Sequence, residues 1–144
     1  MTTRALITAL LIAIASIAAN AQNIVTTYDD GDMLTAQVTI FGVKEKQAMA
    51  QAESILRYAL FFRGLPDSQT CKNPLVGTDE QVAAKHPEYF KQMFEQDRFA
   101  SFLPSSEFLS YTKKNKISVI QFTVNVKALR LDLEQQGVKR RFGF

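Results

Sequence analysis

Two segments of the chain alternate apolar and polar residues with a period of two, and this pattern restricts the fold more than any other feature. The segments are residues 35–43 and 117–126. Their apolar members are Ala36, Val38 and Ile40 in the first segment and Ile120, Phe122, Val124 and Val126 in the second. Because successive side chains of a β-strand point to opposite faces, each segment predicts a strand with one buried face and one solvated face.

Helical periodicity fills the sequence between these two strands. Residues 44–63 place apolar residues three or four positions apart, which predicts one long amphipathic helix that Gly64 and Pro66 end. Further on, Pro87 suits the first turn of a helix over residues 88–96, within an insertion rich in aromatic side chains. We expect this insertion to pack over the core.

A hairpin and a last helix follow the insertion. Residues 107–113 and 117–126 flank the turn residues Lys114–Asn115–Lys116, which is typical of two antiparallel strands. Asn125 is placed to cap a helix over residues 127–136. The order strand, long helix, helical insertion, hairpin, helix predicts an α+β fold, a small, mostly antiparallel sheet with helices packed on one face.

The N-terminus has the pattern of an export signal. Arg4 precedes an apolar run over residues 5–19, and Ala19–Asn20–Ala21 has the small residues that signal peptidase requires. The run is about 15 residues long, whereas a membrane-spanning helix needs roughly 20. These features predict a signal peptide over residues 1–21, export to the periplasm or the medium, and no transmembrane span after cleavage.

The rest of the chain, residues 22–144, is predicted to form a single α+β domain. Residues 22–33 are mostly polar and contain Asp29–Asp30–Gly31–Asp32, which indicates a flexible lead-in and a turn. The three carboxylates do not complete a calcium-binding loop, because no glutamate follows at the spacing that an EF-hand requires.

The chain has one cysteine and one histidine, and these counts exclude several kinds of site. A single cysteine cannot form an internal disulfide, and a single histidine cannot build a multi-histidine metal site. We therefore predict no metal and no cofactor. In an exported protein a lone thiol is either buried or joins two molecules, and we expect Cys71 to be buried.

Short packing and turn motifs recur along the chain. They are Ala48-x-x-x-Ala52, Ala59–Leu60, Phe62–Arg63–Gly64–Leu65–Pro66, Asn73–Pro74–Leu75–Val76, Tyr89–Phe90 and the segment from Leu129 to Val138. Together they resemble small uncharacterised exported proteins of the Bacteroidetes type, over most of residues 22–144. The resemblance implies export and a single domain, and no activity. In element order alone, the chain is also similar to the small α+β domains of envelope lipoproteins and flagellar assembly accessory proteins, although it lacks a lipidation cysteine.

The candidate binding residues lie in a loop and in the aromatic insertion. They are Cys71, His86, Tyr89, Phe90, Phe94 and Phe99. Cys71 and His86 stand in no recognisable catalytic motif, so no catalytic residue is predicted. The aromatic residues form either an exposed binding patch or a second small core, and we favour the core.

Basic residues gather at two places, the hairpin tip with Lys113, Lys114 and Lys116, and the tail with Lys139–Arg140–Arg141. Such clusters bind anionic lipid headgroups or nucleic acid, or simply keep a hairpin tip solvated. Export argues against nucleic acid, and so does a net charge of only +3, of which Arg4 is lost with the signal peptide.

From these features we expect an exported, non-enzymatic domain that binds a protein or a cell-envelope component. The expected partner is an envelope protein or an anionic surface, and the oligomeric state stays open. Two alternatives remain, a small secreted hydrolase-like enzyme that uses His86 or Cys71, and a carrier of an apolar ligand.

Overall fold

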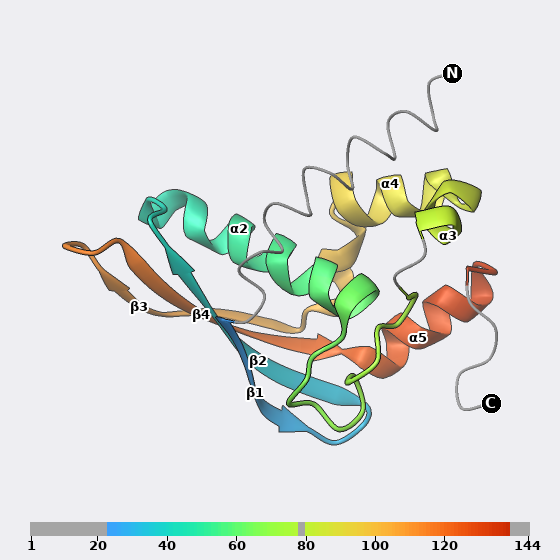
Figure 1. Ribbon diagram of the computed structural model, residues 1–144, viewed down its shortest axis with the longest axis horizontal. Helices are drawn as coiled ribbons and strands as arrows, with labels where there is room; N and C mark the ends of the chain where they lie inside the picture. Colours follow the sequence, from blue (N-terminus) through green and yellow to red (C-terminus); the bar gives the residue numbers. More distant parts are fainter. Residues whose placement is uncertain (1–22, 78–79, 139–144) are drawn as a thin grey trace.

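A four-stranded antiparallel sheet organises the part of the chain that the computed structural model describes, residues 23–77 and 80–138. The strands are β1 (Ile24–Asp29), β2 (Met33–Phe41), β3 (Ser105–Thr112) and β4 (Ile117–Asn125), and their order across the sheet is β1-β2-β4-β3 (Figure 1). The predicted signal peptide and the basic tail lie outside the described residues.

The two central strands are the ones with the alternating pattern. β2 pairs with β4 over its whole length, from Met33 opposite Asn125 to Phe41 opposite Ile117. All the apolar residues that alternate along them face the helices and are buried: Leu34, Ala36, Val38, Ile40, Ile120, Phe122 and Val124. The predicted fold class is therefore confirmed, including antiparallel pairing and one apolar sheet face.

The structure corrects the predicted lead-in over residues 22–33, because the strand β1 occupies its middle. β1 pairs with β2 as an edge strand, and its register shifts between Thr26 and Tyr28. Only Ile24 of this strand is fully buried. An edge position and a bulge both break the alternation that reveals a strand in sequence, which is why the segment looked irregular.

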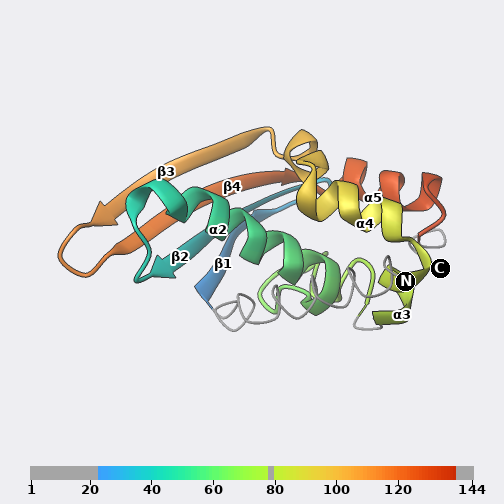
Figure 2. The same cartoon turned by 90° about the horizontal axis from the view of Figure 1, so that it is seen from above.

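The helices lie on the apolar side of the sheet or beyond one of its ends (Figures 1 and 2). They are α2 (Glu45–Tyr58), the π-helical turn η2 (Ala59–Arg63), α3 (Glu80–Lys85), α4 (Pro87–Glu95), the 3-10 helix η3 (Arg98–Phe102) and α5 (Val126–Gln135). α2 crosses over the sheet and α4 lies on the same side (Figures 1 and 2). The α2 residues Ala48 and Ala52 are fully buried, and their small side chains bring the helix close to the strands.

The end of the long helix widens into η2 because a later loop takes up its carbonyl groups. The backbone N–H of Leu75 donates to the carbonyl of Leu60 over 2.8 Å, and that of Val76 donates to Phe61 over 2.9 Å. Gly64 then ends the helix with a φ of 83°. The loop over residues 65–77 is thereby fastened along the helix end.

Local signals at two other helices are also confirmed. Asn125 caps α5, where its side-chain oxygen accepts a hydrogen bond from the backbone N–H of Ala128 over 3.0 Å. Pro87 occupies the first turn of α4, as its fixed backbone angle favours. No helix in residues 23–77 and 80–138 combines the length and the apolar character that crossing a membrane requires.

Candidate functional site

The aromatic candidates are part of the hydrophobic core and form no surface patch. Phe90 and Phe99 are 1% and 0% exposed, and Tyr89 and Phe94 are also buried. The rings of Phe90 and Phe94 pack against Phe61 and Phe62 at the end of the long helix. The Phe99 ring packs against Phe61, and the Tyr89 ring packs edge-on against Phe90. The favoured prediction that these rings are buried is therefore confirmed, but they belong to the core that also covers the sheet and not to a separate second core.

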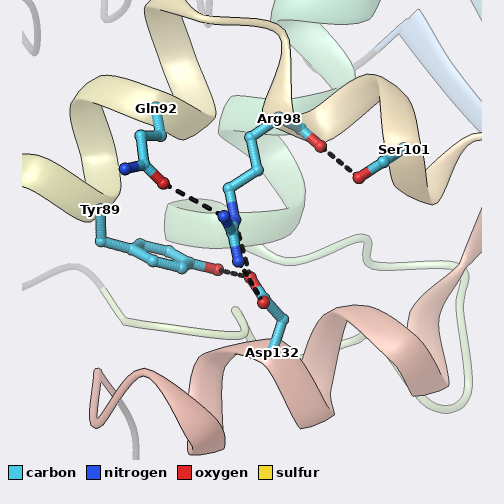
Figure 3. A network of polar contacts seen from close by, with 5 residues as sticks. All are labelled: Tyr89, Gln92, Arg98, Ser101 and Asp132. Atoms are coloured by element: carbon cyan, nitrogen blue, oxygen red, sulfur yellow. Dashed lines mark hydrogen bonds and ion pairs between the residues drawn. The ribbon is translucent and has the colours of Figure 1, made fainter.

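A polar network fastens the aromatic insertion to α5 (Figure 3). The Tyr89 hydroxyl donates to Oδ2 of Asp132 over 2.9 Å, and Nε of Arg98 donates to the same oxygen over 3.2 Å. Nη2 of Arg98 pairs with the other carboxylate oxygen, and Nη1 donates to Gln92. Burial, together with the hydrogen bond to Asp132, raises the pKa of Tyr89. The hydroxyl therefore stays protonated and acts as a structural donor.

A buried cation packs against the same aromatic cluster. The Arg57 guanidinium stands over the rings of Phe94 and Phe99, at 5.0 and 5.7 Å from their centres. Burial lowers the pKa of Arg57, against the opposing influence of the Glu53 and Asp97 charges. The contact with two aromatic faces compensates part of the cost of burying this charge, so Arg57 serves packing.

Cys71 is buried in a loop held by its neighbours, as predicted. Asp29 accepts hydrogen bonds from Ser68 and Thr70, and the Ser68 hydroxyl in turn accepts from the Cys71 backbone N–H over 2.8 Å. The Arg130 guanidinium lies 3.8 Å from the thiol sulfur. Burial raises the pKa of Cys71, with Arg130 acting in the opposite direction. A protonated, buried thiol is a poor nucleophile.

The structure does not bring His86 to Cys71. His86 is half-buried at the start of α4, where its side chain makes no capping hydrogen bond. Among the described residues, the thiol of Cys71 has hydrogen bonds with Thr70 and Arg130, and none with the imidazole. No group of three or more His, Cys, Asp or Glu side chains within this part of the chain is arranged to hold a metal ion.

The surface that remains is the face of the sheet opposite the helices, which we call the open sheet face. The pairing register places on it Val25 and Tyr28 of β1, Thr35, Gln37, Thr39 and Phe41 of β2, Ile117, Val119, Gln121 and Thr123 of β4, and Ser105, Glu107, Ser110 and Thr112 of β3. Glu107 is the only charged residue in this set. Val25, Tyr28 and Phe41 are each more than half exposed.

Hydrogen bonds between β2 and β4 fix the middle of the open sheet face. The Gln37 side-chain amide donates to that of Gln121 over 3.2 Å, and the hydroxyls of Thr35 and Thr123 lie 3.3 Å apart. Such cross-strand pairs order the side chains of this face. Sequence reasoning predicted the polar positions of both strands and a sheet covered on one face, but it sought the site in the aromatic insertion and the loop around Cys71.

Comparison of the chain with protein-family models, with curated protein sequences and with solved structures finds no match. The fold and the site therefore define the class: an α+β domain with one helix-covered sheet face and one broad, almost uncharged open face.

Proposed function

We propose that the chain is an exported, non-enzymatic domain that binds a protein of the cell envelope through its open sheet face. One observation carries the proposal: a four-stranded sheet whose second face bears exposed Val25, Tyr28 and Phe41 and almost no charge. Charged side chains usually keep a solvated sheet face from associating with other proteins. The centres of protein interfaces contain few charged residues.

The size of the face suits a protein and not a small ligand. Four strands about 4.8 Å apart and some eight residues long span about 20 by 27 Å. This plane of roughly 500 Å², enlarged by its side chains, is of the order of the roughly 800 Å² per partner that a specific protein interface buries. Export rests on the pattern of residues 1–21, and the likeness to small exported proteins supports the same assignment.

The test introduces a charge on the open sheet face and compares it with the same change elsewhere. Val25→Glu places a carboxylate on this face, and Leu131→Glu places one on α5, where Leu131 is 45% exposed. We expect affinity purification from the native envelope to recover one partner in stoichiometric amount with the wild type and Leu131→Glu. Recovery should fall at least about ten-fold with Val25→Glu, since a buried unpaired charge costs several kcal/mol.

Thermal melts of the two variants provide the control for folding, and both should match the wild type within a few degrees. Recovery of the wild type without any partner, or equal recovery with both variants, would contradict the proposal.

A further inference from the structure

Two segments far apart in the sequence meet at one end of the sheet and bring five lysines together. The β3–β4 turn carries Lys113, Lys114 and Lys116, and the start of α2 carries Lys44 and Lys46. The backbone N–H of Gly42 donates to the carbonyl of Lys116 over 2.9 Å, which fastens the two segments to each other. Both views place the β3–β4 turn and the start of α2 at the same end (Figures 1 and 2). We call these five lysines the basic end.

The basic end concentrates the positive charge of the chain. Segments 41–47 and 112–117 hold five of the 17 Lys and Arg residues but only Glu45 of the 14 Asp and Glu residues, so 12 basic and 13 acidic residues remain elsewhere. All five lysines are exposed. Within residues 23–77 and 80–138, none of their ammonium groups forms an ion pair with a carboxylate. The charge is therefore available to an anionic partner.

The opposite end of β2 carries the opposite charge. Asp30 and Asp32 are exposed in the turn that precedes Met33, and the basic end begins just after Phe41. Nine strand residues separate the two turns, which is about 30 Å along the strand. A chain with this polarity approaches an anionic surface with the basic end first and the acidic turn last.

An exposed aromatic residue stands next to the lysines. Phe41 is the last residue of β2, pairs with Ile117 beside the β3–β4 turn, and is 54% exposed. An aromatic ring among flexible lysines is typical of protein surfaces that bind lipid headgroups. In such surfaces the ring lies at the level of the headgroups and the ammonium groups contact the phosphates. No arginine occurs in these segments, so the bidentate recognition of single phosphates is not favoured.

We propose that the basic end docks on a bilayer that contains anionic phospholipid, with Phe41 inserted at the level of the headgroups. This surface shares Phe41 with one edge of the open sheet face, excludes the middle of that face, and does not depend on the partner proposed for it. Each lysine near an anionic bilayer contributes about a five-fold increase in partitioning.

The first test measures flotation of the protein, recovered after export in its own host, with two kinds of vesicle. We expect binding to phosphatidylcholine vesicles with about one third phosphatidylglycerol, little binding to pure phosphatidylcholine, and release at high salt. The readout is the ratio of protein bound to anionic vesicles to protein bound to pure phosphatidylcholine vesicles. An apolar N-terminal segment that was still attached would bind both kinds of vesicle equally and would not change this ratio. Intact mass identifies the N-terminus of the material used.

Matched charge variants locate the surface. Lys113→Gln with Lys114→Gln should lower partitioning into anionic vesicles about 25-fold, from two lysines at about five-fold each. Lys91→Gln with Lys127→Gln removes the same charge from exposed positions on α4 and α5, and should change partitioning less than about two-fold. The proposal would be overturned if both pairs of substitutions changed vesicle partitioning equally, or if the wild type showed no preference for anionic vesicles. The partner of the basic end would then be an acidic protein.

The second test uses a fluorescent reporter, which the composition makes possible. The chain has no tryptophan, so Phe41→Trp provides a single emission signal. We expect a blue shift of this emission with anionic vesicles and quenching by lipids brominated near the headgroup. An unshifted emission on vesicles that do bind the protein would overturn the insertion of residue 41. Val25→Glu should keep vesicle binding, which separates the failure of this proposal from the failure of the proposed function.

Discussion

At the scale of the residue, Gly64 is the position where the backbone leaves no room for a side chain. A Cβ there would lie 2.2 Å from the carbonyl oxygen of Lys72, and its φ of 83° favours glycine. We expect Gly64→Ala to lower the free energy of unfolding by about 3 kcal/mol or more, measured by urea denaturation. Gly42→Ala is the matched control, since Gly42 has a φ of 74° but nothing within 4 Å of its Cβ. It should cost only about 1 kcal/mol, and equal losses would refute the role of the Lys72 contact.

Asp29 is the residue whose ionisation stabilises the β1–β2 turn. Partial burial alone would raise its pKa, but hydrogen bonds from Ser68, Thr70 and Gly31 outweigh burial and lower the pKa to about 2. A lowered carboxyl pKa contributes stability above the unfolded value near 3.8, and that stability is lost as the pH falls towards 2. Because the group is only partly buried, we expect Asp29→Asn to cost only about 1 kcal/mol at pH 7.

Urea titrations at pH 7 and at about pH 2.5 test this expectation. The difference between the wild type and Asp29→Asn should shrink at the lower pH, whereas Asp32→Asn, in the same turn, should show little difference at either pH. A constant difference for Asp29→Asn at both pH values would mean that its charge plays no part.

At the scale of the element, the network around Asp132 holds the aromatic insertion against α5. Asp132→Ala leaves the Tyr89 hydroxyl and the Arg98 guanidinium without their shared acceptor, and we expect a loss of about 2 kcal/mol. The loss should be local, so hydrogen exchange should quicken in α4 and η3 more than in β2 and β4. Tyr89→Phe removes one donor and keeps the ring, and it should cost about 1 kcal/mol. Uniform quickening across the sheet would contradict a local role.

The elements that the sequence predicted well are those with two unlike faces. β2, β4 and α2 each bury one face, so their periodicity was visible, and Asn125 capped α5 as expected. β1 was not predicted, because an edge strand with a bulge does not alternate apolar and polar residues regularly. The sequence predicted the basic cluster of the hairpin tip, but not that Lys44 and Lys46 lie beside it, nor that Arg98 pairs with Asp132. These residues are distant in sequence, and only the pairing of strands and the packing of helices bring them together.

At the scale of the whole molecule, the two proposed surfaces share Phe41 at one edge, but their remaining residues are separate, so changes at Val25 and at the lysines should act independently. The open sheet face spans the four strands, with Val25 on the edge strand β1, whereas the basic end closes the sheet at the β3–β4 turn. A domain held on a bilayer by its basic end would therefore keep most of that face free for a protein. Vesicles should then carry the domain and its partner together.

The triple variant Val25→Glu, Lys113→Gln, Lys114→Gln tests this independence. Distant, unconnected sites add within about 0.5 kcal/mol, which is about a two-fold change. We expect the triple variant to lose partner recovery by the factor seen for Val25→Glu, and vesicle binding by the factor seen for the lysine pair. The lysine pair alone should leave partner recovery from a detergent extract unchanged. If it lowers recovery, the partner also touches the basic end, and the two surfaces form one interface.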